Sequence, residues 1–90
     1  MAKYKAKVFV NLRPSVLDPA GEAVISAAKR LQLEGIEKLR IGKYIDIEIN
    51  APDGEEAKRR IELLADRLLA NPVIEDWEMD ISEYKAIFAE

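Results

Sequence analysis

Cysteine, histidine and threonine are all absent from this 90-residue sequence, and serine occurs only three times. Without cysteine, the chain has neither a disulfide nor a thiolate metal site. Without histidine, it lacks the commonest metal ligand and the commonest general base at neutral pH. A domain of this size buries only about 60–65% of the surface that its unfolded chain exposes. Small folds usually gain the missing stability from disulfides, a metal or a partner chain, so association is the compensation that we expect here.

Long apolar runs are also lacking, since none approaches the roughly 18 residues that span a bilayer. The first five residues alternate charged and apolar side chains, unlike a signal peptide, so we expect a cytoplasmic protein. The net charge is −3, from 14 basic and 17 acidic residues, which argues against a dedicated nucleic-acid binder because such proteins need a basic surface. Hydrophobic residues make up 49% of the chain, as in a globular domain rather than a disordered chain.

Two stretches near the ends of the chain alternate apolar and polar side chains, at residues 4–12 and 73–81. This period predicts two half-buried strands. The polar positions of the first stretch include Lys5 and Lys7, whereas those of the last stretch are acidic. Opposite charges on facing strands attract one another, so we expect these two strands to be neighbours.

The first of two amphipathic helices is predicted over residues 19–33. Asp18 is a suitable N-cap, and Pro19 suits the first helical position. Apolar residues then recur at helical spacing. Gly35 occupies the place where a left-handed C-terminal cap is expected.

The second helix begins with a predicted capping box, in which Asp53 caps the helix and Glu56 reaches back to it. Asn71 and Pro72 then stop the helix. We expect a single domain over residues 1–81. The remaining residues, 82–90, form a predicted C-terminal tail, and their apolar members suit one face of a further helical turn: Tyr84, Ile87 and Phe88.

The segment from Lys38 to Asn50 carries its aliphatic residues at odd positions. A hairpin at Gly42-Lys43 would divide this apolar set between two faces, whereas one continuous strand keeps it on one face. Such a strand would extend about 43 Å, and a helix of 15 residues would cover only about 23 Å of it. The uncovered isoleucine face predicts that a second chain contributes its sheet.

The order strand–helix–strand–helix–strand predicts an α+β fold related to the ferredoxin-like arrangement. We expect two amphipathic helices on one face of an antiparallel or mixed sheet, with the long strand shared across an oligomer. The sequence alone leaves a dimer and a tetramer equally open.

No set of nucleophile, base and orienting residue can be assembled from this sequence. Asp46 and Glu48 share a strand face and could hold Mg²⁺, but such pairs are common on any solvated strand. The basic run at residues 58–60 suits a phosphate, but equally the solvated side of a helix. Gly42-Lys43 lacks the rest of a phosphate loop. We therefore expect no catalytic residue and no metal site within this chain.

Three stretches carry a more specific signal. They are VFVNLRPSVLDPAG at residues 8–21, RIGKY at residues 40–44 and LLANPVIE at residues 68–75. In this order they resemble the motifs of the PurS family, the small subunit of bacterial and archaeal phosphoribosylformylglycinamidine synthase. The most specific element is VLDP followed by Gly21. The resemblance covers residues 4 to about 81, with departures at Pro14-Ser15 and Ala20.

This resemblance implies a function that the residues alone do not reveal. PurS proteins dimerise and join a large synthetase subunit to a glutaminase subunit. The complex converts formylglycinamide ribonucleotide, glutamine and ATP into formylglycinamidine ribonucleotide in de novo purine synthesis. The resemblance implies that this chain is a bridge that supports ammonia transfer, has no cofactor of its own and leaves ATP and Mg²⁺ to the large subunit. As partners we expect those two subunits and further copies of the chain, as a homodimer or homotetramer, with neither nucleic acid nor membrane.

Roles for individual residues follow as hypotheses. The candidates for contact with a partner subunit are Arg40, Lys43, Tyr44 and Phe9. The candidates for structural motif residues are Asp18, Pro19, Gly21, Gly42, Asn71 and Pro72. For Arg40 and Lys43, a purely structural role stays equally open. The alternative function is a freestanding ferredoxin-like regulatory module that binds a small ligand at its dimer interface.

Overall fold

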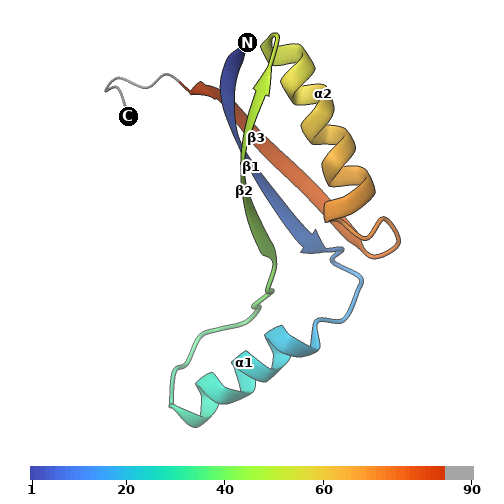
Figure 1. Ribbon diagram of the computed structural model, residues 1–90. Coiled ribbons are helices and arrows are strands. Elements are labelled where there is room, and N and C mark those ends of the chain that lie inside the picture. Colours follow the sequence, from blue (N-terminus) through green and yellow to red (C-terminus); the bar gives the residue numbers. More distant parts are fainter. Residues whose placement is uncertain (85–90) are drawn as a thin grey trace.

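A three-stranded antiparallel sheet with strand order β2–β1–β3 forms the body of the protein, in a computed structural model that describes residues 1–84 (Figure 1). The elements along the chain are β1 (Ala2–Leu12), α1 (Pro19–Arg30), β2 (Lys43–Ala51), α2 (Gly54–Leu64), a π-helical turn η1 (Ala65–Leu69) and β3 (Glu75–Tyr84). The predicted α+β class and the order of strands and helices are confirmed. Among these residues, no helix is both long and apolar enough to cross a membrane.

The first strand, β1, lies at the centre of the sheet, with one apolar face buried in the core and one basic face between the acidic residues of β2 and β3. Tyr4, Ala6, Val8 and Val10 are buried on one face. On the other face, Lys7 lies opposite Asp46 of β2 and Asp80 of β3. The predicted pairing of the first and last strands is therefore confirmed, and opposite charges lie at facing positions.

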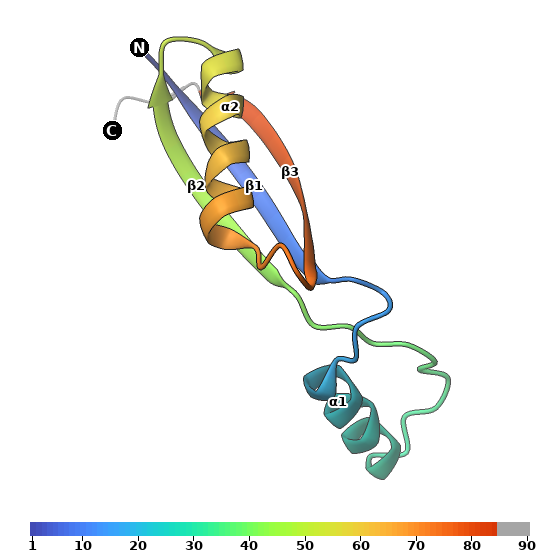
Figure 2. The same ribbon diagram turned by 90° about the vertical axis from the view of Figure 1, so that its right-hand side faces the viewer.

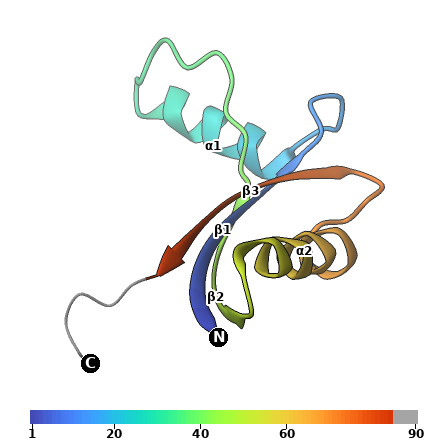
Figure 3. The ribbon, with the colours of Figure 1, turned by 90° about the horizontal axis from the view of Figure 1, so that it is seen from above.

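Helix α2 covers the apolar face of the sheet through side chains spaced four residues apart. Ala57, Ile61 and the first residue of η1, Ala65, are almost fully buried and pack on the buried side chains of β1. Figures 2 and 3 show this single helix along one side of the three strands. The aliphatic and aromatic side chains of the two outer strands are only partly buried against this core: Ile45, Ile47, Ile49, Trp77, Met79 and Ile81. One helix is therefore too narrow to cover the whole face.

The other helix, α1, lies beyond the end of the sheet and not over it (Figures 1 and 2). The expectation that both helices cover one face is therefore wrong for α1 within a single chain. The radius of gyration is 17.5 Å, against about 12 Å for a compact domain of this length. The physical reason lies in hydrogen bonds that hold the start of α1 against the segment before β2, described below.

The second strand is shorter at its beginning than the sequence predicts. β2 begins at Lys43, opposite Val10, rather than at Lys38, and a continued register would leave residues 38–40 without a β1 residue opposite them, because β1 ends at Leu12. There is no hairpin at Gly42-Lys43 in this segment, as the isoleucine pattern indicates. At the other end of the chain, β3 continues to Tyr84, and the predicted helical turn at Ile87 and Phe88 lies outside the described residues.

The end of α1 also differs from the expectation that Gly35 caps it. The helix stops at Arg30, and Gln32 takes the left-handed conformation with φ of 62°. The amides of Gln32 and Leu33 donate to the carbonyls of Lys29 and Ala28, both at 3.0 Å. This is a Schellman arrangement, in which glutamine stands where glycine is usual.

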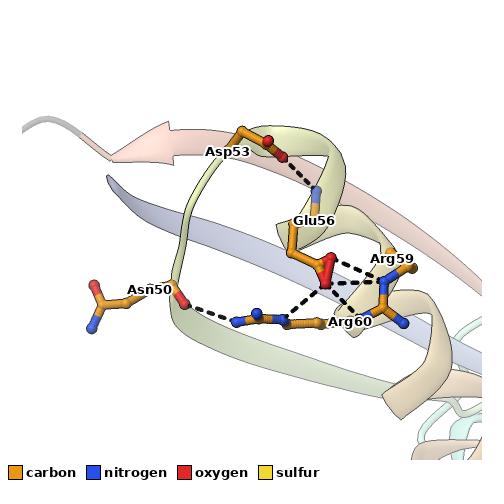
Figure 4. A network of polar contacts seen from close by, with 5 residues as sticks. All are labelled: Asn50, Asp53, Glu56, Arg59 and Arg60. Carbon is orange, nitrogen blue, oxygen red and sulfur yellow. Dashed lines mark hydrogen bonds and ion pairs between the residues drawn. The ribbon is translucent and has the colours of Figure 1, made fainter. Parts of the chain in front are cut away.

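Helix α2 begins at the predicted cap, since Asp53 accepts a hydrogen bond from the Glu56 amide at 2.8 Å. The carboxylate of Glu56 does not reach back, because it accepts hydrogen bonds from Arg59 at 3.0 Å and Arg60 at 3.4 Å (Figure 4). Arg60 also lies 3.5 Å from the carbonyl of Asn50. The Arg59 hydrogen bond is the largest cause that lowers the pKa of Glu56 to about 2.

This pairing predicts a pH-dependent stability. An unfolded glutamate has a pKa of about 4.3, so the lowered pKa of folded Glu56, about 2, adds stability that is fully present above that unfolded value. The contribution is lost as the pH falls towards the folded value. In urea unfolding, Glu56→Gln is expected to be less stable than the parent protein at neutral pH and to approach it near pH 2–3. Glu55→Gln, at an exposed position of the same turn, is the control. An equal deficit of Glu56→Gln at all pH values would contradict the prediction.

Candidate partner interface at the end of the sheet

The three motif stretches, far apart in the sequence, meet where β1 ends and β2 begins. We call this region the motif junction and define it as residues 13–21, 39–43 and 71–76. Hydrogen bonds connect its first segment to each of the other two. The segment from residue 13 to residue 42, which contains α1, leaves the sheet at this junction and returns to it, and we call it the arm.

A buried carboxylate holds the two ends of the arm together. Asp18 is only 5% exposed. One of its oxygens accepts a hydrogen bond from the Gly21 amide at 3.0 Å, which caps α1, and the other accepts from the Ile41 amide at 2.8 Å. These two backbone bonds, led by that of Ile41, lower the pKa of Asp18. The ionised carboxylate is therefore the form that the structure stabilises.

A second link between the two ends of the arm runs from a side chain at its end, Arg40, to the backbone at its start. The guanidinium of Arg40 donates to the backbone carbonyl of Arg13 at 2.9 Å and to that of Val16 at 2.7 Å. Asp18 thus binds the backbone beside Arg40, and Arg40 binds the backbone before Asp18. We call these two residues the arm clamp, because together they fix where the arm leaves and returns.

Two glycines of the motif junction allow backbone segments to approach closely. A Cβ at Gly21 would lie 2.5 Å from the carbonyl oxygen of Leu39. A Cβ at Gly42 would collide with the Asn11 side chain and lie 2.8 Å from the carbonyl oxygen of Val10. Neither glycine has a positive φ, so space rather than backbone conformation requires glycine at both positions.

The turn into β3 is held by Arg13, which the sequence analysis did not single out as a functional residue. Its guanidinium donates to the carbonyls of Pro72 at 2.7 Å and Val73 at 3.1 Å, and to the Asp76 carboxylate at 3.1 Å. The side chain of Asn71 accepts from the Val73 amide at 3.0 Å. The only sequence signal for Arg13 was its place inside the first motif stretch.

Phe9 and Tyr44 lie on the sheet face opposite α2, whereas Lys43 lies opposite the buried Val10 and so on the α2 face. Phe9 and Tyr44 face each other across β1 and β2, with ring centroids 5.2 Å apart. They remain 39% and 53% exposed. Tyr44 also borders a hollow of about 480 Å³ that is lined mainly by charged side chains of this face. Lys43 lies 3.7 Å from Glu75. The structure therefore brings Phe9 and Tyr44 together but uses the Arg40 guanidinium inside the chain.

The acidic pair that suggested Mg²⁺ does not gain a third ligand. Within residues 1–84, no group of three or more acidic side chains lies close enough together to hold a metal ion. Asp46 lies instead opposite Lys7, and Glu48 opposite Lys5. The arrangement suits cross-strand pairing on a solvated sheet face.

Comparison with known proteins accounts for the three motif stretches. A sequence model described as PurS, phosphoribosylformylglycinamidine (FGAM) synthase, matches residues 5–83. The chain belongs to the PurS family. The synthase subunit PurS of Synechocystis is 46% identical over 79 residues, covering 88% of this chain and 79% of that protein. The PurS subunit of Bacillus subtilis is 39% identical, covering 92% of this chain and 98% of that protein.

Solved PurS structures share the fold as well as the sequence. Bacillus subtilis PurS superposes with a TM-score of 0.81 at 39% identity, covering 89% of this chain and 99% of that chain. A chain of the PurLQS structure from Thermotoga maritima superposes with a TM-score of 0.82 at 32% identity, covering 93% of this chain and all of that one. These similarities favour the PurS family over a freestanding ligand-binding module.

The close approach at Gly21 predicts an unusual effect of an alanine substitution. Gly to Ala inside a helix normally stabilises by about 1 kcal/mol. At Gly21 we expect destabilisation of about 1–3 kcal/mol, because the new methyl group must displace the backbone of Leu39. Thermal and urea unfolding measure the effect, with Ser26→Ala on an exposed position of the same helix as the control. A Gly21→Ala variant as stable as the parent would show that the arm does not approach this closely.

Proposed function

We propose that this chain is the small, non-catalytic subunit of phosphoribosylformylglycinamidine synthase and bridges its large synthetase and glutaminase subunits. Membership of the PurS family supports this role. The single observation that carries the structural part of the proposal is the motif junction, where the Asp18 carboxylate accepts from two backbone amides and the Arg40 guanidinium donates to two backbone carbonyls. Because both side chains are already hydrogen-bonded to the backbone of this chain, they suit a structural role better than a catalytic one.

In the proposed complex, the chemistry belongs to the other subunits. Glutamine hydrolysis supplies ammonia, and ATP drives the amidination of formylglycinamide ribonucleotide, with ATP and Mg²⁺ held in the large subunit. This chain contributes surfaces that fix the position of the glutaminase subunit relative to the synthetase subunit, so that ammonia passes from one to the other. We place the assembly in the cytoplasm.

The surface that we propose for a synthase partner is the exposed pair Phe9 and Tyr44 on the open face of the sheet. Binding energy at protein interfaces concentrates in aromatic side chains with a polar surround. Here charged side chains occupy the neighbouring positions on the same face: Lys7, Asp46 and Glu78. Arg40 contributes indirectly, by holding the arm in place.

Reconstitution tests the proposed function. This chain and the two partner subunits of one organism are purified, and glutamine-dependent, ATP-driven amidination is measured with and without it. We expect activity to require the chain, while glutaminase and synthetase proteins alone give little coupled turnover. Ammonia supplied in place of glutamine is the control, since it bypasses the transfer between subunits. Full glutamine-dependent activity without the chain would overturn the proposal.

The proposed partner surface predicts an effect on assembly alone. We expect the double variant Phe9→Ala/Tyr44→Ala to weaken binding to the synthase partners about tenfold or more in a quantitative pull-down, because two aromatic anchors are lost. Its melting temperature should fall only modestly, since Phe9 and Tyr44 are 39% and 53% exposed. Leu63→Ala, at a 49% exposed apolar position of α2 outside this face and outside the motif junction, is the matched control. Unchanged binding by the double variant would remove this face from the partner interface.

A further inference from the structure

The turn that leads into β3, residues 70–74, is bonded to the start of the arm. The Arg13 guanidinium donates to the carbonyls of Pro72 at 2.7 Å and Val73 at 3.1 Å. The Arg13 amide donates to the carbonyl of Ile74 at 2.8 Å. Three hydrogen bonds from one residue therefore hold the point at which the arm leaves the sheet against this turn.

The same turn is joined to the other end of the arm through Glu75, the first residue of β3. The Glu75 carboxylate accepts a hydrogen bond from the Asn71 amide at 2.7 Å and lies 3.7 Å from the ammonium group of Lys43. Lys43 directly follows the arm in the sequence, and the Glu75 side chain is only 15% exposed. We call Arg13, Lys43 and Glu75 the brace, because they connect one turn to both points at which the arm meets the sheet.

Hydrogen bonds within the turn make it a rigid support. The carbonyl of Asn71 accepts from the amides of Ile74 at 3.2 Å and Glu75 at 2.8 Å, and its side chain accepts from the Val73 amide at 3.0 Å. The turn begins at Ala70, which is buried in the core beneath α2. Movement of the turn relative to the sheet would therefore break packing as well as hydrogen bonds.

Helix α1, by contrast, has no packing on the body of its own chain that would fix its direction. None of its residues, 19–30, belongs to either cluster of buried core residues, and it lies beyond the end of the sheet (Figures 1 and 2). The arm clamp closes the arm upon itself, because Asp18 and Arg40 bind backbone groups that all belong to the arm. The side chains that tie the arm to the body are those of the brace.

Small changes at the brace are amplified along the arm. Helix α1 has 12 residues. It is therefore about 18 Å long, so that a rotation of about 10° at its base moves its far end by about 3 Å. In enzymes, a displacement of about 1 Å that originates far from the chemistry can lower the rate about 100-fold. The activity of an assembly that holds this arm is therefore sensitive to the arm's direction.

We propose that Arg13 and Glu75 are positioning residues that set the direction of the arm relative to the sheet and thereby support glutamine-dependent turnover of the synthase. The part that concerns turnover rests on the proposed bridging function, since a bridge must hold its two partners at a fixed spacing. The ion pair of Arg13 with Asp76 contributes little, because the Asp76 side chain is 64% exposed. The forked guanidinium that spans two neighbouring carbonyls is the essential feature, and lysine cannot reproduce it.

Distances between two spin labels measure the direction of the arm, because the chain contains no cysteine of its own. The labels are attached at Glu34→Cys in the arm and Ser82→Cys on the sheet, both exposed positions, and the labelled chain is diluted with an excess of unlabelled chain. We expect Arg13→Lys to shift or broaden the distance distribution by about 3 Å, as a rotation of about 10° would.

The matched control is Arg67→Lys, the same change at an exposed position of η1 outside the motif junction, which should leave the distances unchanged. If Arg13→Lys does not fold, Glu75→Gln takes its place, since it removes the charge that faces Lys43. An unchanged distance distribution in the variant of the brace would overturn the proposal. This measurement contains no synthase partner, so its outcome does not depend on the proposed function.

The reconstituted synthase tests the effect on turnover. We expect Arg13→Lys to lower glutamine-dependent amidination about tenfold or more, because the arm is displaced, and to leave ammonia-dependent amidination within about twofold. Arg67→Lys should leave both rates unchanged. Unchanged glutamine-dependent turnover, or an equal loss of both rates, would overturn the positioning role. A parent chain that glutamine-dependent turnover does not require would instead overturn the proposed function, so the two failures are distinguishable.

Discussion

The buried carboxylate of Asp18 is the constraint on which the arrangement of this chain depends. A charge that is 5% exposed is tolerated only when hydrogen bonds replace its water, and here two backbone amides do so, one at the start of α1 and one just before β2. The bond to Ile41 joins two segments separated by the whole of α1. It therefore closes the arm at its base and sets the direction in which α1 leaves the sheet.

The sheet itself is asymmetric, and the asymmetry follows from the alternation along β1. Its buried apolar side chains form the core beneath α2, while its lysines lie between acidic strands on the other face. Exposed charge pairs of this kind add little stability but disfavour a shift in register, which would place the lysines against apolar neighbours. The result is a two-layer body with an incompletely covered apolar face.

A scaffold whose motif residues bind its own backbone suits the proposed bridging role. The motif stretches of the PurS family converge on one end of the sheet, where Arg13, Asp18 and Arg40 bind backbone groups of this chain. Rigidity at this point places the arm on one side of the junction and the open sheet face, with Phe9 and Tyr44, on the other. One subunit can thus present separate surfaces to a second copy and to other proteins.

The sequence predicted those features that depend on a local pattern of side chains. Alternation predicts the strands, facing charges predict that the first and last strands pair, and Asp53 predicts the start of α2, because each of these depends on neighbours a few residues away or on simple complementarity. The candidate site was only partly predictable. The resemblance located its three motif stretches, but neither their meeting at one end of the sheet nor the importance of Arg13 can be read from spacing.

The tertiary structure alone decided the position of α1, the start of β2 at Lys43 and the use of Arg40 inside the chain. Each depends on contacts between segments whose relative position no local pattern encodes. An amphipathic helix has the same sequence whether it covers its own sheet or extends away from it. The sequence by itself determined that α1 has an apolar side to bury, and the hydrogen bonds of Asp18 and Arg40 decided that its own sheet lies out of reach.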